Sequence, residues 1–329
     1  MVQPFLASCM LFSIASAAFT QENTESTTAG SKAKVGNQQL AGTDSEKIPE
    51  SRIPIQVERH LVFREFKDGT SLKADLFRPT AEAPPDGFPL VLMIHGGAWS
   101  GGDKWDLLDH GRELAQAGFV AVAINYRLAP KVKIGKQLED CNAAARWAIS
   151  QAKEWKANPD RFGLWGYSAG AHLASLLALR TSRNAVTKEL SQDTLKTEAR
   201  TSVRAVVAGG IPADFSFVPE KSPFLAHVFG GSRFKLPKIY EEFSPLAQVH
   251  GKAPPFFLFH GDSDFLVPYK LSLKMSDALN DAGVSCKHMK IANKGHMLTF
   301  LDRSARRAAI GFLRANLTQR VPIDPSKDP

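Results

Sequence analysis

Apolar and polar positions follow a regular order from residue 55 onwards. Residues 55–66 and 72–77 are two strand-like runs, and Asp68-Gly69 between them is a strong hairpin turn signal. Residues 90–94, with the sequence LVLMI, form an unbroken apolar run typical of a parallel strand buried on both faces. The pattern therefore predicts a sheet that opens with an antiparallel pair and continues with parallel strands.

Beyond residue 94, strand-like and helix-like segments alternate. Further strands are expected at residues 119–124, 161–167, 203–208, 256–259 and 285–291. Helices are expected at residues 104–117, closed by Gly118, and at 137–156, 169–179, 269–282 and 303–317. This order predicts an α/β fold over residues 52–317, a three-layer sandwich with about eight mostly parallel strands.

Two segments do not fit the alternation. Residues 181–201 are polar and charged, and we expect an excursion between a helix and the next strand. Residues 214–252 are rich in Phe and Pro and are too long for a simple connection. This second segment is a candidate lid or substrate-binding wall, and a packed surface excursion is an equally supported alternative.

The first residues form an apolar segment without charge that ends in small residues. Ala15-Ser16-Ala17 has the pattern of a cleavage site, so residues 1–18 are predicted to be a signal peptide, although the positive residues usual at its start are missing. The segment is too short and too rich in serine for a membrane span. We therefore expect export, to a periplasm or out of the cell, with lipidation at Cys9 as a lesser alternative.

The segments that flank the domain have a different composition. Residues 19–51 are polar, with almost no large apolar side chain, and are predicted to be a disordered linker. Residues 318–329 are expected to be a C-terminal tail. Once the signal is removed, Cys141 and Cys286 remain, and we expect two buried thiols rather than a disulfide.

The bulk composition, with 43% hydrophobic and 22% charged residues, is that of an ordinary globular protein. The net charge of +8 comes from scattered Lys and Arg, so nucleic acid is not expected as a partner. The sequence has no metal-ligand spacing, phosphate loop or dinucleotide fingerprint, and we expect neither metal nor cofactor. It contains no indication of the oligomeric state.

A candidate nucleophile stands in the frame Gly166-Tyr167-Ser168-Ala169-Gly170, between an expected strand and an expected helix. In a G-x-S-x-G pattern, a tight strand-to-helix turn lifts the serine hydroxyl above the sheet, and side chains at the two glycines would collide with neighbouring backbone. An ordinary turn serine is the alternative. The flanking strand and helix favour Ser168 as a nucleophile.

A glycine-rich loop, His95-Gly96-Gly97-Ala98-Trp99, follows directly on the strand at residues 90–94. Without Cβ atoms, its backbone amides can turn towards a substrate oxygen. We expect the amides of Gly97, Ala98 and Ala169 to form an oxyanion hole, the last at the start of the helix after Ser168. A simple Gly-rich turn is the alternative, and His95 is interpreted as a structural residue rather than a base.

The candidate acid and base follow later strands. Asp262 and Asp264 both come after the strand at 256–259, and the spacing of Asp264 to Val267-Pro268 favours it as the acid, with Asp262 supporting the turn. His296 follows the last strand and completes the chain order Ser, Asp, His. A lone surface histidine is the alternative interpretation of His296.

The whole combination resembles the α/β-hydrolase esterases of the hormone-sensitive-lipase-like and feruloyl/acetyl-esterase-like (BD-FAE-like) type. The matching segments are HGGAWSGGDK at 95–104, NYRLAP at 125–130, QLEDC at 137–141, NPDRFGLWGYSAGAHLA at 158–174, FSPL at 243–246, PPFFLFHGDSDFLVP at 254–268 and KGHM at 294–297. The sequence departs from the family pattern at Ala98, where a third glycine is usual, and at Ile134-Gly135, where relatives tend to have Phe-Pro.

The resemblance implies an α/β-hydrolase fold, the triad Ser168, Asp264 and His296, and hydrolysis of carboxylic esters through an acyl-enzyme. A small-molecule or polysaccharide ester is the expected substrate, with short acyl groups such as acetyl or feruloyl on carbohydrate. Two alternatives stay open: an amide-acting relative similar to arylformamidases or peptidases, and a catalytically silent α/β-hydrolase domain that serves as a binding module. The filled triad and oxyanion positions favour an enzyme.

Overall fold

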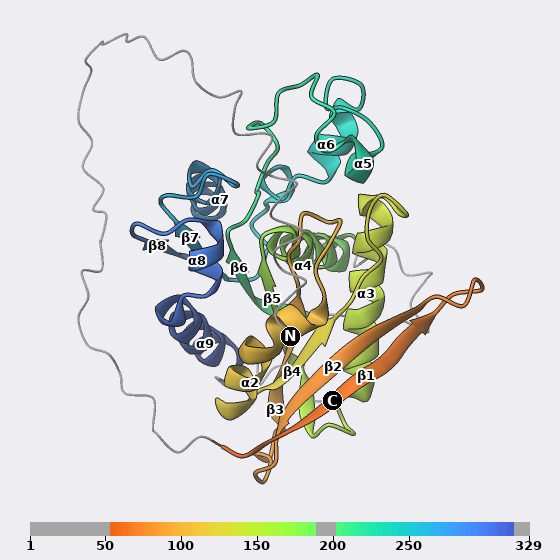
Figure 1. Cartoon of the computed structure of the whole chain (residues 1–329). Helices are drawn as coiled ribbons and strands as arrows, with labels where there is room; N and C mark the ends of the chain where they lie inside the picture. The colour runs from red at the N-terminus through yellow and green to blue at the C-terminus, as the bar shows by residue number, and fades with distance from the viewer. Residues whose placement is uncertain (1–52, 189–201, 319–329) are drawn as a thin grey trace, which may run out of the picture. The chain divides into compact units, whose positions relative to one another are not determined.

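A computed structural model describes residues 53–188 and 202–318 (Figure 1). Within these residues one sheet contains eight strands in the order β1-β2-β4-β3-β5-β6-β7-β8. The strands are β1 (Ile55–Glu65), β2 (Ser71–Pro79), β3 (Phe88–Ile94), β4 (Val120–Ile124), β5 (Ala157–Tyr167), β6 (Val203–Gly209), β7 (Phe256–Gly261) and β8 (Cys286–Ile291). The ladders β1·β2 and β2·β4 are antiparallel and the others are parallel, which confirms the predicted sheet.

The opening hairpin forms where its turn signal predicts it. Gly69 has φ +80°, a conformation that glycine adopts without steric cost, and the Asp68 side chain accepts a hydrogen bond of 2.9 Å from the Thr70 amide. Gly118, past the end of the first long helix, also has a positive φ, of +89°. Both glycines therefore end their elements as expected.

Helices cover both faces of the sheet and make three layers (Figure 1). Along β3, Leu90, Leu92 and Ile94 point to one side and Val91 and Met93 to the other, as the two-residue period of a strand requires. The first side packs against α3 (Ile134–Gln151), α4 (Ala169–Lys188) and α7 (Lys270–Asp281), and the second against α2 (Leu108–Gln116) and α9 (Arg303–Leu317). Five short helices complete the described elements: η2 (Lys104–Leu107), α5 (Ala226–Phe229), α6 (Pro237–Glu242), η3 (Leu246–Gln248) and α8 (His296–Phe300).

Helix α4 is longer than predicted, so the expected excursion from residue 181 is wrong as far as Lys188. The hydroxyls of Thr181 and Ser182 donate to the carbonyls of Leu177 and Ala178, four residues back, at 2.7 and 2.8 Å. The two hydroxyls thus find their acceptors within the helix itself. Residues 1–52, 189–201 and 319–329 lie outside the described residues. The predicted signal peptide and linker, and all but the first residue of the predicted tail, fall in these ranges.

Cys141 and Cys286 are both free thiols. Cys141 is buried, as expected, whereas Cys286 is partly exposed. Burial raises the pKa of the Cys286 thiol to about 11.

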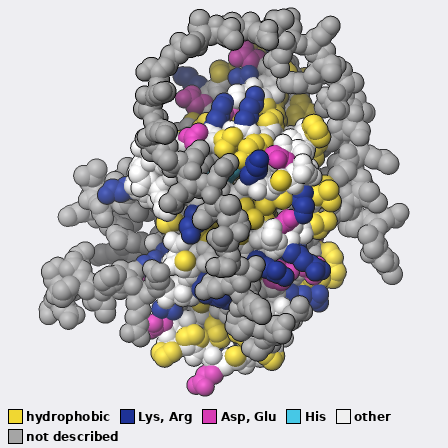
Figure 2. All heavy atoms as spheres, turned by 90° about the vertical axis from the view of Figure 1, so that its left-hand side faces the viewer, with side chains coloured by type: hydrophobic (Ala, Val, Ile, Leu, Met, Phe, Trp, Pro, Cys, Tyr) yellow, Lys and Arg dark blue, Asp and Glu magenta, His cyan; other side chains and the backbone are white. Residues whose placement is uncertain are grey.

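On the face shown in Figure 2, Lys and Arg side chains are interspersed with acidic and apolar ones. Among the described helices, none is both long and apolar enough to cross a bilayer.

A buried histidine in α2 makes stability depend on pH. The ring of His110 stacks on Phe300 at 4.7 Å and meets Trp165 edge-on, and burial lowers its pKa to about 3. The unfolded chain binds a proton there below about pH 6.5, whereas the folded protein does not until about pH 3. The stability that depends on the neutral ring is therefore fully present above pH 6.5 and is lost progressively as the pH falls towards 3.

We expect His110→Phe, which keeps an aromatic ring in this site, to make the free energy of unfolding less dependent on pH. At pH 5 the variant should take up about one proton fewer than the parent on unfolding. Urea denaturation at several pH values between 4.5 and 7.5 gives this number from the slope of the unfolding free energy. Buried His95 and His172, with pKa values of about 4 and about 3, keep part of the slope in the variant. Equal slopes for both proteins would contradict the assignment.

Candidate active site

Ser168 stands on the turn between β5 and α4, at the carboxyl end of a central parallel strand. Its φ of 54° lies in the left-handed region that serine rarely adopts. A Cβ on Gly166 would lie 2.2 Å from the Gly170 carbonyl oxygen, and a Cβ on Gly170 would lie 2.0 Å from that of Ile94. Glycine is therefore required at both positions, and the turn has the geometry that the sequence pattern predicts.

The loop after β3 lies directly against this turn. A Cβ on Gly96 would be 3.3 Å from the Ser168 Cβ. Gly97 and Ala98 have φ values of 110° and 51°, so the backbone turns sharply here, and the left-handed conformation of Ala98 costs about 1–2 kcal/mol that a third glycine would avoid. Within the described residues, the backbone amides of Gly97, Ala98 and Ala169 donate to no acceptor. Amides without an acceptor are free to bind a group from outside the protein.

Several bonds hold the loop in this conformation. The Trp99 carbonyl accepts hydrogen bonds from the Gln137 side chain at 2.7 Å and from the Ala129 amide at 2.9 Å. The buried His95 ring donates from Nδ1 to the Gly96 carbonyl at 2.7 Å and stacks on Tyr126 at 4.4 Å. Burial lowers the pKa of His95 to about 4. His95 is thus a neutral support of the loop.

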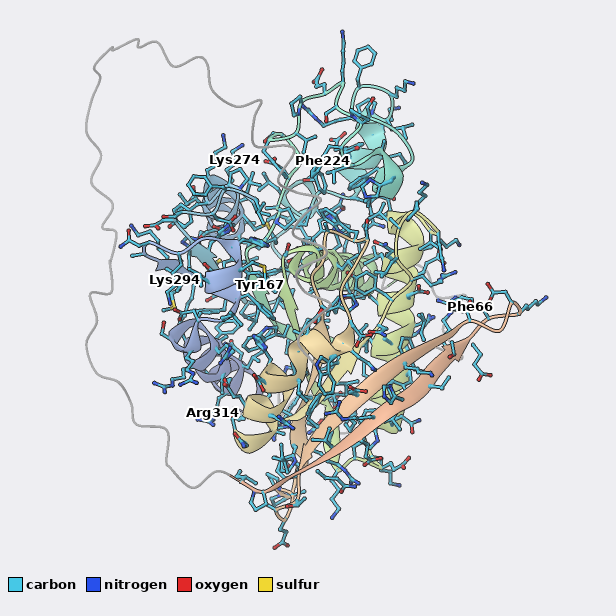
Figure 3. The ribbon with its side chains drawn as sticks, in the orientation of Figure 1. Phe66, Tyr167, Phe224, Lys274, Lys294 and Arg314 are labelled. Atoms are coloured by element: carbon cyan, nitrogen blue, oxygen red, sulfur yellow. The ribbon has the colours of Figure 1, made fainter. Side chains whose placement is uncertain are left out.

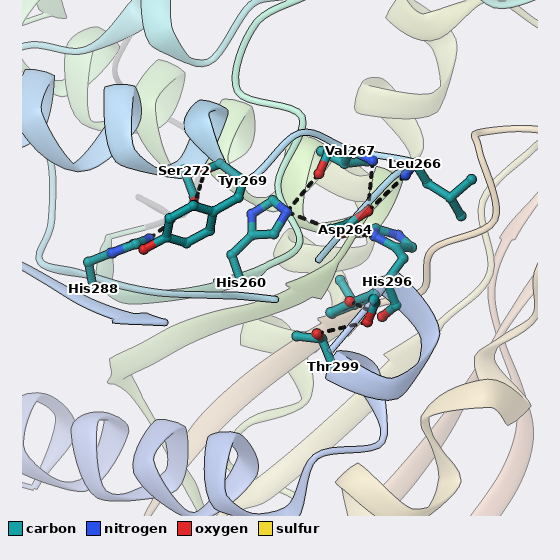
Figure 4. Close-up of polar contacts among 11 residues, drawn as sticks. His260, Asp264, Leu266, Val267, Tyr269, Ser272, His288, His296 and Thr299 are labelled. Carbon is teal, nitrogen blue, oxygen red and sulfur yellow. Dashed lines mark hydrogen bonds and ion pairs between the residues drawn. The ribbon is translucent and has the colours of Figure 1, made fainter. Parts of the chain in front are cut away.

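Asp264 and His296 lie together after β7 and β8. The Nδ1 atom of His296 is 2.6 Å from Oδ2 of Asp264, whose side chain is fully buried (Figure 4). Burial by itself would raise the pKa of Asp264, but hydrogen bonds from His260 and His296 hold it well below its ordinary value. Asp262 instead accepts a hydrogen bond of 2.7 Å from the Asn293 amide and joins two turns.

His296 follows β8, as predicted, and is the first residue of the short helix α8. Gly295 before it is extended, and the Gly295 carbonyl accepts hydrogen bonds from the amide and hydroxyl of Thr299. The Tyr167 hydroxyl, just before Ser168 in the chain, donates to the His296 carbonyl at 2.5 Å (Figure 3 labels Tyr167 beside α8). A Cβ on Gly210, at the end of β6, would be 2.9 Å from the His296 ring, and the Ser168 amide donates to the adjoining Gly209 at 2.8 Å.

Ser168 and His296 therefore border the same strand end. The hydrogen bonds of the described residues do not include one between the Ser168 hydroxyl and the His296 ring. The structure thus brings Asp264 and His296 into direct contact, with Ser168 at the end of the same strand β6 that His296 borders. The hydrogen bond between a catalytic serine and its histidine is commonly long in proteins without substrate and shortens when substrate binds.

Two buried histidines near this site were missed by the sequence analysis. His260 contacts Asp264 at 3.1 Å, and His172 in α4 accepts from the Trp99 indole at 3.3 Å and donates to the Phe243 carbonyl at 2.7 Å. Burial lowers the pKa of His172 to about 3, so it is a neutral link. Both histidines stand in segments that match the family, at 158–174 and 254–268, and this was the available signal. Residue type alone does not indicate which acceptor either ring contacts.

Residues 214–252 pack against the loop after β3. Phe215 and Phe229 lie 6.0 and 6.3 Å from the Trp99 ring, and both aromatic side chains are buried. The exposed His227 ring is 2.9 Å from the Ser100 hydroxyl. Together with the link from His172 to Phe243, these contacts connect the segment to the candidate oxyanion loop at several positions.

Among the described residues no cluster of His, Cys, Asp and Glu suits a metal ion.

The fold, the serine turn and the facing glycine loop define an α/β-hydrolase. The BD-FAE family model matches residues 74–279, and the chain belongs to this family.

The comparisons with individual proteins agree with this family. The chain is 29% identical to the esterase LipQ of Mycobacterium tuberculosis, over 73% of this chain and 58% of that protein. It is also 29% identical to the isoprenylcysteine alpha-carbonyl methylesterase ICME of Arabidopsis thaliana, over 76% of this chain and 59% of that protein. The chain thus spans somewhat more than half the length of these curated relatives. A carbohydrate esterase from gut microbiota shares the fold, with a TM-score of 0.69 and 20% identity over 82% of this chain and 99% of that structure.

Proposed function

We propose that the protein is a serine hydrolase that cleaves carboxylic esters through an acyl-enzyme, with Ser168, Asp264 and His296 as its triad. The bond of 2.6 Å between Nδ1 of His296 and Oδ2 of Asp264 carries the proposal. Because a carboxylate only accepts, this bond places the imidazole hydrogen on Nδ1 and leaves Nε2 as the base for Ser168. The names of the relatives, which are esterases, support ester hydrolysis.

The proposed reaction has two stages. His296 takes the proton of the Ser168 hydroxyl as the oxygen attacks the acyl carbon, and Asp264 stabilises the resulting imidazolium. The amides of Gly97, Ala98 and Ala169 hold the oxyanion of the tetrahedral intermediate. His296 then gives its proton to the leaving alcohol, and a water that it activates cleaves the acyl-enzyme in the same way.

We further propose a short acyl group, acetyl or feruloyl, on a carbohydrate alcohol. The buried aromatic side chains of residues 214–252 pack against Trp99, which favours a fixed substrate-binding wall rather than an open lid. Large apolar side chains stand exposed next to the triad residues, with Phe265 94% exposed and Leu298 60% exposed. They offer an aromatic ring and an aliphatic side chain against which an aryl group or a sugar ring can pack.

A comparison of esters with a matched amide tests this proposal. We expect turnover of p-nitrophenyl acetate, butyrate and octanoate with kcat/KM falling along the series, and much slower release of p-nitroaniline from p-nitroacetanilide, since an amine leaves less readily than a phenol. Acetylated and feruloylated xylo-oligosaccharides then distinguish the two acyl groups by the free acid released. Faster anilide than ester turnover would favour an amidase, and a folded protein without any turnover would favour a binding module.

The carbohydrate substrate agrees with the predicted export, which we also propose for this protein. The apolar segment at residues 1–18 and its Ala15-Ser16-Ala17 site support it. Expression of the full-length chain and N-terminal sequencing of the secreted or periplasmic fraction test this, with a mature start after residue 17 or 18 as the expected result.

A further inference from the structure

The carboxylate of Asp264 is surrounded by hydrogen-bond donors. Its Oδ1 atom accepts from the backbone amides of Leu266 and Val267, both at 2.9 Å. Its Oδ2 atom is shared by two histidine rings, with Nδ1 of His296 at 2.6 Å and Nε2 of His260 at 3.1 Å (Figure 4). Two donors on each oxygen leave the carboxylate little freedom to rotate.

The tautomer of His260 follows from its partners. Its Nε2 atom faces Oδ2 of Asp264 at 3.1 Å and the carbonyl of Val267 at 2.9 Å, and both oxygens only accept. Nε2 therefore carries a hydrogen, shared between these two acceptors in a three-centre bond. The Nδ1 atom is buried without a hydrogen-bond partner in the described part of the chain.

The ring of His260 is held in place from both sides. The residue belongs to β7, whose backbone is fixed in the sheet, and its side chain is completely buried. The ring meets that of Tyr269 edge-on, with centroids 5.8 Å apart. A ring held by a strand and an aromatic neighbour is a rigid donor.

We propose that His260 is a positioning residue for the reaction, which fixes Asp264 so that Oδ2 faces Nδ1 of His296. This inference rests on the proposed function, since it assigns a role within that triad. Without the bond from His260, the carboxylate could turn away from His296 while both amides still held Oδ1. The base would then be oriented less well, although substrate binding would not change.

A pair of variants separates this role from general support of the fold. In His260→Gln the amide nitrogen can stand near the position of Nε2 and reach Asp264, whereas in His260→Asn the shorter side chain places it near Nδ1. We expect H260N to lower kcat on p-nitrophenyl acetate by about 10- to 100-fold with KM nearly unchanged, and H260Q to recover most of the loss. His288→Gln is the matched control, because His288 packs on the same Tyr269 but bonds Ser272, and its kcat should stay within about twofold of the parent.

The competing role, support of the turn through Val267 alone, is tested by repeating H260N in an Asp264→Asn background. If His260 acts through the carboxylate, the second substitution should lower kcat by less than about twofold in that background. An equal loss in both backgrounds, or a folded H260N with the kcat of the parent, would overturn the inference while leaving the proposed function intact. Absence of ester turnover in the folded parent would overturn both. If H260N does not fold, His260→Phe, which keeps a ring against Tyr269 and lacks the donor, takes its place.

Discussion

Replacing Ser168 with alanine is expected to lower kcat for p-nitrophenyl acetate by about a millionfold, because the variant has no atom that can form the acyl-enzyme. The turn itself should persist, since its conformation is fixed by Gly166 and Gly170. Steady-state kinetics on the purified variant measure the loss, and circular dichroism with thermal unfolding shows whether the fold is kept.

A matched control lies on the helix that follows. Ser175 is fully buried in α4, and its hydroxyl has no hydrogen-bond partner among the described residues. Ser175→Ala likewise removes one serine hydroxyl, from the helix next to Ser168, and should retain the activity of the parent. If Ser168→Ala retained activity instead, the nucleophile would have to be sought elsewhere.

The second large effect is expected at Asp264 and distinguishes its role from that of the neighbouring Asp262. Asp264→Asn should lower kcat by about ten thousandfold, because an amide at this position favours the wrong tautomer of His296. Asp262→Asn should act mainly on stability, by about 1 kcal/mol, since Asp262 accepts a bond from the Asn293 amide and lies 3.7 Å from the Lys290 ammonium.

Steady-state kinetics rank the two variants by their loss of kcat, and urea denaturation ranks them independently by their free energy of unfolding. The expected result in D264N is a loss of kcat far larger than its loss of stability can explain, because the variant still folds, and in D262N a loss of stability with little change in kcat. A larger loss of kcat in D262N would move the acid to Asp262, against the position of Asp264 next to His296.

The sequence was informative about the sheet because local signals and the required fold agree there. The apolar run of β3 must be buried on both faces, and Gly69 and Gly118 mark turns that their backbone conformations require. The length of α4 was underestimated because its last turns are polar. Thr181 bonds a carbonyl of the helix itself, and Arg180 and Arg183 contact Glu242 and Gln248. These partners lie more than sixty residues away in the chain, beyond the reach of local patterns.

In the candidate site, too, some residues have a local sequence signal and others do not. Ser168, Asp264 and the glycine loop stand in recognisable frames, because tight turns and close backbone approaches allow few residue types. His260 and His172 also stand in the segments that match the family, but a single histidine in an apolar element most often indicates a core residue. Their contacts with Asp264 and the Phe243 carbonyl become evident only in the folded structure.

A fluorophosphonate probe reacts with activated serine nucleophiles and therefore tests whether Ser168 is one. We expect the protein without residues 1–18 to take up one phosphonyl group per chain, on Ser168 by peptide mass spectrometry, and Ser168→Ala to take up none. Absence of labelling in a folded protein, or labelling of another residue, would exclude Ser168 as the nucleophile and favour a binding module or a different catalytic centre.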